Sequence, residues 1–285
     1  MSKLSENTNR IQGLLNDISA LPKDRYEEGV ITGGAKLRSI VNRSITEITA
    51  EDLEGLTQIG DYAFYRCTKL TSVQFPEKIN EIKQYAFYGC NLIETIRIPE
   101  TVMYINSSAF QGCTSLVSVT LPQALQNING SVFRECGFEE IVLPNNLTGI
   151  DSYAFYGCKN LKSITIPDKI TLLSSAVFQQ CKNLTSVTLP QNLKNIGSFA
   201  FYDCDSLPSI TIPKTVTTID RSAFGSCDAL NRVRVEATTP PSIQSNTFSG
   251  NPSTCIYEVP FESLELYKTA TNWSQYADRI FAIEE

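Results

Sequence analysis

Residues 158–180 read CKNLKSITIPDKITLLSSAVFQQ, and residues 181–203 repeat the pattern as CKNLTSVTLPQNLKNIGSFAFYD. The pattern extends along most of the chain, because nine phenylalanines from Phe64 to Phe248 recur every 22 to 24 residues. Eight of them are followed three residues later by a cysteine, at Phe64/Cys67, Phe87/Cys90, Phe110/Cys113, Phe133/Cys136, Phe155/Cys158, Phe178/Cys181, Phe201/Cys204 and Phe224/Cys227. Self-similarity at a fixed period of this length is typical of a solenoid of stacked units.

Each unit contains one predicted strand that ends at a proline. Residues 118–121 (SVTL) show the alternation of polar and apolar residues that predicts a short strand with one buried face. A proline follows the alternating segment in seven units, at Pro76, Pro99, Pro122, Pro144, Pro167, Pro190 and Pro213. Proline has no backbone N–H and cannot continue a hydrogen-bonded ladder. The rest of the unit predicts a turn or a single helical turn that returns the chain to the next strand.

Stacking is required because a single unit cannot bury its own apolar side. Neighbouring units are therefore expected to place their strands in a parallel sheet and their phenylalanines in a continuous core. One unit departs from the pattern, since Cys136 and Pro144 are one residue closer together than their counterparts, and Glu139 and Glu140 lie between them. We expect a local irregularity of the stack at that unit.

The segments that flank the repeats are predicted to cover the ends of the solenoid. Apolar residues at helical spacing predict a helix between Leu4 and Leu21, which Pro22 stops. This helix is interpreted either as a cap on the first unit or as a segment (residues 4–21) for oligomerisation or docking. Aromatic residues predict a C-terminal cap, at Tyr257, Phe261, Tyr267, Trp273 and Tyr276. The predicted divisions are 1–38 for the N-terminal helix or cap, 39–237 for about eight or nine repeats, and 238–285 for the C-terminal cap.

The cysteines are the first candidates for chemistry, because eight of the nine lie in the repeat frame. No C-x-x-C motif occurs and the chain has no histidine, so the thiols do not form a zinc site of a known spacing. Equivalent cysteines of adjacent coils would point in the same direction, whereas a disulfide needs Cβ atoms that face each other. We therefore predict a buried column of free thiols, with the off-frame Cys255 as the one candidate for an exposed thiol.

No catalytic constellation is found. The absence of histidine removes the Ser-His-Asp and Cys-His schemes. Carboxylates occur as adjacent pairs at 27–28, 139–140 and 284–285, a spacing that does not place two carboxyl groups across a substrate. The Gly33-Gly34 pair is not part of a phosphate-binding motif. No cofactor and no metal are predicted, and the protein is not expected to be an enzyme.

Composition excludes two classes of partner. The formal net charge is −6 with a pI near 5.0, which argues against nucleic acid, whose binding proteins carry basic stripes. No stretch approaches 18 consecutive apolar residues, so no membrane-spanning helix is predicted. The first residues lack the apolar core of a secretory signal.

The candidate binding surface consists of the outward residues of successive strands, which are mostly hydroxyl-bearing. These residues are Ser72, Gln74, Thr95, Arg97, Ser118, Thr120, Ser163, Thr165, Ser186, Thr188, Ser209, Thr211, Arg232 and Arg234. They are interpreted either as residues that merely suit an exposed strand or as a shallow polar groove for an extended peptide or a glycan. Tyrosines follow the phenylalanine in four units, at Tyr65, Tyr88, Tyr156 and Tyr202. They either pack against the neighbouring coil or contribute to an interface.

The repeat resembles the BspA-like leucine-rich repeats of bacterial surface proteins. The resemblance is carried by L-x-x-[IV]-x-[IL]-P followed by I-x-x-x-A-F-x-x-C, from about Leu53 to Val235, and by the tail with Pro240-Pro241 and 256–260 (IYEVP). It implies an α/β-type repeat solenoid. The expected fold is a curved, right-handed leucine-rich-repeat superhelix with one parallel sheet, and turns or short helical segments on its other side. Relatives are often adhesins or host-interaction proteins.

Two functions are therefore expected from different classes. The first is a non-enzymatic adhesion module of a host-associated bacterium that binds a protein or glycan ligand through the solenoid surface. The second is a structural component of a phage or other assembly, docked through the N-terminal helix. The resemblance implies the cell surface, while the missing signal sequence leaves an intracellular or phage-borne location open, or a chain whose signal has been removed.

Overall fold

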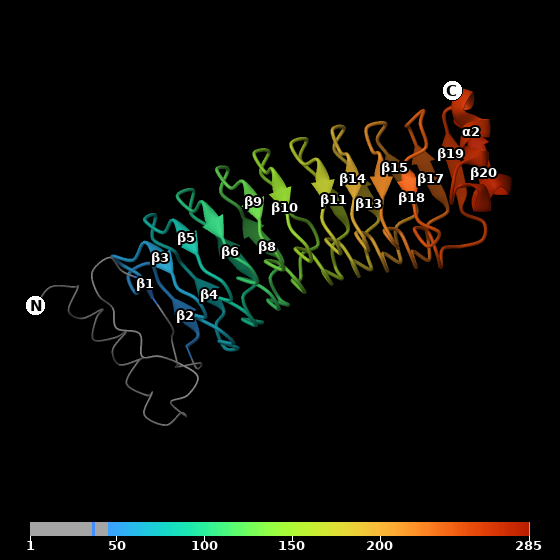
Figure 1. Cartoon of the computed structure of the whole chain (residues 1–285). Coiled ribbons are helices and arrows are strands. Elements are labelled where there is room, and N and C mark those ends of the chain that lie inside the picture. The colour runs from blue at the N-terminus through green and yellow to red at the C-terminus, as the bar shows by residue number, and fades with distance from the viewer. Residues whose placement is uncertain (1–35, 38–44, 285) are drawn as a thin grey trace, which may run out of the picture. The chain divides into compact units, whose positions relative to one another are not determined.

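The computed structural model describes residues 45–284 and the backbone of residues 36–37. The chain forms two compact units, Met1–Phe138 and Glu139–Glu285, of which the described parts are considered separately. In both units the chain winds through successive coils that stack with parallel strands (Figure 1). The predicted helix at Leu4–Leu21 lies outside the described residues.

The first unit carries two rows of parallel strands. The first row contains the predicted strands, β2 (Glu47–Ile48), β4 (Ser72–Val73), β6 (Thr95–Arg97) and β8 (Ser118–Thr120). The second row contains β1 (Lys36–Leu37), β3 (Gln58–Ile59), β5 (Glu81–Ile82), β7 (Tyr104–Ile105) and β9 (Asn127–Ile128). Hydrogen bonds join β1, β3, β5 and β7 into one sheet, and β9 lies beside β7.

The second unit also has two rows of parallel strands. The first row contains β11 (Ser163–Thr165), β13 (Ser186–Thr188), β15 (Ser209–Ile212), β17 (Arg232–Val235), β19 (Ile256–Val259) and β20 (Ile280–Ala282). The second row contains β10 (Gly149–Ile150), β12 (Leu172–Leu173), β14 (Asn195–Ile196), β16 (Thr218–Ile219) and β18 (Ser242–Ile243). Both rows continue past residue 237, because β18 pairs with β16 and β19 pairs with β17.

The second row is the main difference from the sequence expectation of a single sheet backed by turns or short helical segments. Each of its strands has only two residues, and from β3 onward these are an outward one and a buried one such as Ile82 or Ile196. Two residues are too few to show a period of two in the sequence. Within the described coils, the remainder of each unit consists of turns, and the α-helical and 3-10 segments lie after residue 260.

Stacked phenylalanine rings fill the core of both units. In the first unit, the Phe64, Phe87, Phe110 and Phe133 rings follow one another at 4.9, 5.3 and 5.9 Å between centroids. In the second unit, the rings of Phe155, Phe178, Phe201, Phe224 and Phe248 are separated by 5.2–5.6 Å. Neighbouring ring planes differ by at most 15°. Burial of apolar area on this scale is the main stabilising contribution of the fold.

The turn that carries each phenylalanine is itself a hydrogen-bonded ladder. The Phe178 N–H donates to the Ala200 carbonyl of the next coil at 2.9 Å, and the Gln180 N–H donates to the Tyr202 carbonyl at 2.8 Å. The N–H groups between them bond within their own coil, as Gln179 does to Ala176. Alternate N–H groups therefore point along the stack, which gives each coil a third point of backbone attachment.

This turn requires two left-handed residues per coil. One precedes the phenylalanine by two positions, at Tyr62, Tyr85, Ser108, Ser131, Tyr153, Ala176, Phe199 and Ser222. The other follows it by two positions, at Arg66, Gly89, Gly112, Glu135, Gly157, Gln180, Asp203, Ser226 and Gly250. Their φ angles lie between 52° and 81°. Side chains other than glycine disfavour this region, so most coils carry a conformational cost that the ladder offsets.

The predicted irregularity at 136–144 is confirmed. Where other coils form a strand, Glu140 makes only an isolated bridge to Ser163. The shortened coil passes close to its predecessor at Gly137, where an added Cβ would clash with the Thr114 carbonyl oxygen. Only glycine permits this close approach.

The aromatic cap is formed by four of the five predicted residues. Tyr257, Tyr267, Trp273 and Tyr276 are buried in or beside η2 (Phe261–Ser263), α2 (Leu264–Thr269) and η3 (Ser274–Arg279). The Trp273 indole lies 5.8 Å from the Phe248 ring, the last ring of the core column, and donates to the Pro241 carbonyl at 2.8 Å. The prediction is wrong for the fifth residue, Phe261, whose side chain is 78% exposed at the start of the 3-10 turn.

The left-handed positions generate a stability prediction. Gly112→Ala should lower the free energy of unfolding by about 1 kcal/mol, because its φ is 75° and the cost is conformational. An added Cβ at this position meets no atom closer than 3.6 Å, so a clash does not contribute. Conversely, Gln180→Gly should be more stable than Gln180→Ala by about 1 kcal/mol, since both lose the side chain and only glycine relieves the strain. Urea denaturation measures the free energy of unfolding of all three variants. Equal stability of the two Gln180 variants would contradict the role of this conformation.

Candidate binding surfaces

The hydroxyl residues of the second unit line up from strand to strand. Ser163 and Thr165 are paired in register with Ser186 and Thr188, and β15 lies beside β13 with Ser209 and Thr211 at the equivalent positions. Five of these six side chains are exposed, and that of Ser163 is half-buried. We call these six residues the hydroxyl ladder. The rungs on β11 and β13 follow the separation of hydrogen-bonded strands, about 4.8 Å.

The first unit has a shorter and less uniform version of this surface. Thr95 pairs with Ser118 and Arg97 pairs with Thr120. Ser72 and Gln74 are exposed on the preceding coil. The Arg97 guanidinium is bound to the Glu77 carboxylate at 2.8 Å, so this arginine is not a free cation on the face.

One of the two arginines at the end of the first row, Arg232, has a carboxylate partner. Arg232 and Arg234 continue the hydroxyl ladder on β17, in register with Ser209 and Thr211. Glu258 of the next strand pairs in register with Arg234, and its carboxylate lies 3.5 Å from the Arg232 guanidinium. Sequence analysis missed this partner because Glu258 lies beyond the regular frame.

A hollow opens at the start of the hydroxyl ladder. The irregular coil 140–145 replaces a strand there, and a depression of about 320 Å³ results. Its lining includes Val142, which is 83% exposed, and Ser163 and Thr165 of β11. The hollow therefore adds an apolar contact point and the Glu140 carboxylate to the start of the hydroxyl ladder.

Of the four tyrosines named from the sequence, Tyr65 and Tyr88 stack on each other, and Tyr156 and Tyr202 pack beside other rings. The Tyr65 and Tyr88 rings stack at 5.0 Å, and each is half-buried. Sequence analysis missed Tyr62 and Tyr85, which stack in the same way at 5.0 Å and contact the first pair. In the second unit Tyr156 packs against Tyr153, and Tyr202 packs against Phe199. Their ring faces are engaged by neighbouring rings.

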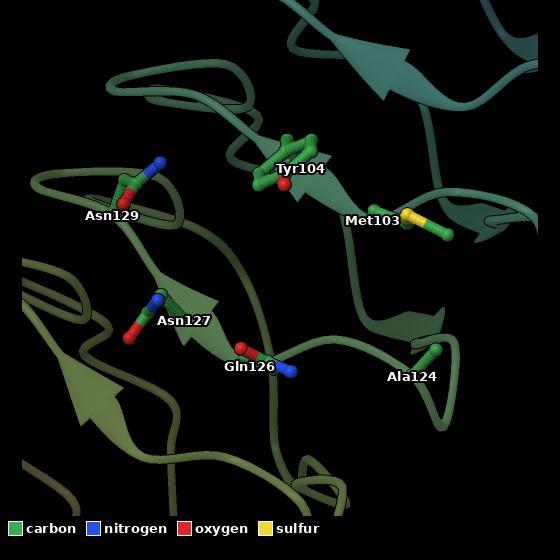
Figure 2. Close-up of a pocket in the computed structure, with 6 residues that line it drawn as sticks. All are labelled: Met103, Tyr104, Ala124, Gln126, Asn127 and Asn129. Atoms are coloured by element: carbon green, nitrogen blue, oxygen red, sulfur yellow. The ribbon is translucent and has the colours of Figure 1, made fainter.

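A second depression lies on the second row of strands in the first unit. Figure 2 shows Met103 and Tyr104 on one coil beside Gln126, Asn127 and Asn129 of the next. The volume is about 240 Å³. Met103 and Tyr104 are 58% and 62% exposed. Sequence analysis did not find this surface because it assigned no outward face to the second half of the repeat.

The comparisons with known proteins fit this architecture. Residues 40–162 and 126–255 match the family described as BspA type Leucine rich repeat region, in six copies. The chain belongs to the BspA-type leucine-rich repeat family. BspA-type repeats are generally a non-enzymatic scaffold for binding, and protein is the usual class of partner. No curated protein matches the sequence.

A solved structure at 29% identity has the same fold, and two others match with lower TM-scores. A leucine-rich repeat protein of T. pallidum is 29% identical, with a TM-score of 0.56, over 66% of this chain and 90% of that chain. A leucine-rich cell surface protein from Faecalibacterium prausnitzii A2-165 is 21% identical, with a TM-score of 0.41, over 84% of this chain and 85% of that one. The pneumococcal vaccine antigen PcpA is 18% identical, with a TM-score of 0.46, over 84% and 67%.

The cysteines of this BspA-type solenoid form the buried column that the sequence predicts. The thiol donates to the phenylalanine carbonyl of the preceding coil at Cys90, Cys113, Cys136, Cys181, Cys204 and Cys227; the Cys204 Sγ bond to Phe178 is 3.3 Å long and the Cys227 Sγ bond to Phe201 is 3.1 Å long. All nine cysteines are buried, and none belongs to a disulfide. The prediction of an exposed Cys255 is wrong, because the residue is 0% exposed beneath the C-terminal cap. Three residues after Phe248, where the other coils carry their cysteine, the chain has Asn251. Its Oδ1 accepts the Cys227 N–H at 2.9 Å.

Burial makes these thiols unreactive. It raises the pKa of Cys113 and of Cys227 to about 12, and the pKa of Cys255 to about 11. Since the thiolate is the reactive form, little of it exists near neutral pH. Across residues 45–284, no group of three or more cysteine, aspartate or glutamate side chains could hold a metal ion. The same part of the chain has no helix that is long and apolar enough to cross a membrane.

A thiol titration should separate the folded from the unfolded chain. At pH 8 a disulfide-exchange reagent should label fewer than one thiol per native molecule, and all nine after the addition of urea. Absorbance of the released chromophore measures the count. Rapid labelling of several thiols in native protein would contradict the buried column.

Proposed function

We propose that this protein is a non-enzymatic adhesion module of a host-associated bacterium that holds a protein or glycan ligand on the outward face of its first row of strands. The observation that carries the proposal is the hydroxyl ladder, which presents serine and threonine pairs in register on β11 and β13 and at the equivalent positions of the neighbouring β15. Association with a host and adhesion rest on the resemblance to BspA-like surface proteins.

The chemistry of the hydroxyl ladder suits an extended polar ligand. Each serine or threonine hydroxyl both donates and accepts hydrogen bonds, so successive rungs can follow either peptide groups or sugar hydroxyls. The ladder contains no charged side chain, and the hollow beside Val142 offers one apolar contact at its end. A ligand that lies across the strands would meet an equivalent pair of hydroxyls in each coil.

An enzymatic function has little support in the residues. The chain has no histidine, and its thiols are buried with raised pKa values. Of the carboxylates beside the hollow, Glu139 is bound to the Lys162 ammonium at 2.6 Å. These features favour a surface that holds its ligand without transforming it.

A pair of lysines in the middle of the hydroxyl ladder should weaken ligand binding. Ser186→Lys/Thr188→Lys replaces the central rung by long charged side chains, and we expect binding to weaken by at least about tenfold, or 1.4 kcal/mol. The wild-type protein is first tested against immobilised extracellular-matrix proteins and a printed array of glycans. Surface plasmon resonance then compares the variants on each ligand found.

The matched control is Gln191→Lys/Asn192→Lys, which adds the same charge at exposed turn positions just beyond the strand. It should bind as the wild type does. The proposal is wrong if the wild type binds nothing on either panel, or if the ladder variant and the control bind equally well.

A further inference from the structure

Met103 and Tyr104 interrupt a column of polar residues. At the position of Tyr104, the other coils of the first unit carry Gln58, Glu81 and Asn127 on the second row of strands. At the position of Met103 they carry Thr57, Asn80 and Gln126. Both residues are more than half exposed, so neither fills the core. Two side chains with large apolar groups thus lie on the surface where the compared coils of the first unit carry polar ones.

The Tyr104 ring is available to a ligand. The rings of Tyr62, Tyr65, Tyr85 and Tyr88 stack on one another within the same unit. Among the described residues, no aromatic ring contacts Tyr104. An exposed ring offers a flat apolar face with a hydroxyl at its edge, which suits a ligand that is partly apolar and partly polar.

The next coil places amide groups beside this ring, and one of them is held in position. Asn129 Nδ2 donates to the Ile105 carbonyl at 3.0 Å and to Asn106 Oδ1 at 3.4 Å. Asn106 is fixed in turn, because its Nδ2 donates to Glu81 Oε1 at 2.8 Å. Both N–H groups of the Asn129 amide are thereby used, and its carbonyl oxygen keeps its capacity to accept. Gln126 and Asn127 add exposed amides to the same lining.

Size and charge limit the kind of ligand. The depression of about 240 Å³ is smaller than the roughly 300–1,000 Å³ clefts that enclose drug-sized molecules. It therefore has room for one ring of a larger ligand. None of its six lining residues is charged. A charged group of a ligand would lose its hydration here and gain no partner of opposite charge, so a neutral ligand is favoured.

An extended peptide fits this depression less well than a sugar. Peptides that add to a sheet need free backbone groups, whereas the Met103 N–H already donates to Asn80 and the Asn106 N–H to Ile82. A pyranose has an apolar C–H face and a rim of hydroxyls that both donate and accept. The ring of Tyr104 can pack against the C–H face, and the amides of Gln126, Asn127 and Asn129 can bond to the hydroxyls.

We propose that Tyr104, with Met103 and the three amides, forms a subsite for one neutral pyranose ring of a glycan. The ring stacks on Tyr104, and its adjacent hydroxyls bond to the amide groups. This site lies on the second row of the first unit and is independent of the hydroxyl ladder of the second unit, so either proposal can fail without the other.

Saturation-transfer NMR and calorimetry with neutral oligosaccharides test this subsite. The probes are maltotetraose, cellotetraose, chitotriose and lacto-N-tetraose, each titrated against the 285-residue chain. We expect at least one to bind, with saturation transfer strongest at the C–H protons of one ring. Tyr104→Ala should weaken that binding by about tenfold, because a stacked ring is lost, while Tyr104→Phe should stay within about threefold.

Two matched controls keep the test specific. Tyr153→Ala removes a tyrosine that is also exposed but lies in the second unit, and it should leave oligosaccharide binding unchanged. Ser186→Lys/Thr188→Lys, which disrupts the hydroxyl ladder, should also leave it unchanged. The proposal is overturned if no probe binds the wild type, or if Tyr104→Ala binds as tightly as Tyr153→Ala. It is also overturned if the depression captures only peptides, seen as chemical-shift changes at Tyr104 with a peptide library and none with sugars.

Discussion

The fold depends on one repeated turn, in which a phenylalanine points into the core while its backbone N–H donates to the next coil. The seven such bonds within the two units run from 2.7 to 3.1 Å, as Phe64 to Ala86 and Phe224 to Thr247 illustrate. Left-handed residues on either side of the phenylalanine turn the N–H groups along the stack. Ring stacking and backbone pairing thus fix the same spacing between coils, so local and global preferences agree.

Fixing the inner side of each coil leaves the outer side free to vary. The Phe and Cys columns are alike in nearly every coil, because each coil needs the same core and the same thiol-to-carbonyl contact. Recognition is therefore expected where the coils differ. The hydroxyl ladder with its hollow and the Tyr104 subsite are two such places, on different rows and in different units. A repeat protein of this kind can change one surface without disturbing the other.

The sequence predicted those features that recur with a recognisable period. The phenylalanine column, the buried cysteines and the first row of strands follow from the 23-residue spacing and from a period of two before each proline. The second row was missed because its two-residue strands show no period, and Tyr104 was missed with it. Glu258 and Cys255 lie where the frame fades, so the ion pair of Arg232 and the burial of the ninth thiol could be seen only in the structure. Phe261 was assigned to the cap from its residue type, although its place at the start of a 3-10 turn leaves it in solvent.

Residue-resolved hydrogen exchange tests the central claim most directly. The amides of Phe178 and Gln180 lie in a turn but donate to the next coil, as the Ile166 amide of the first row does. We predict that all three are protected to a similar extent, while the amides of the exposed turn at Asp168 and Lys169 exchange quickly. Exchange of Phe178 and Gln180 as fast as that of Asp168 and Lys169 would show that the phenylalanine turn does not hold the coils together.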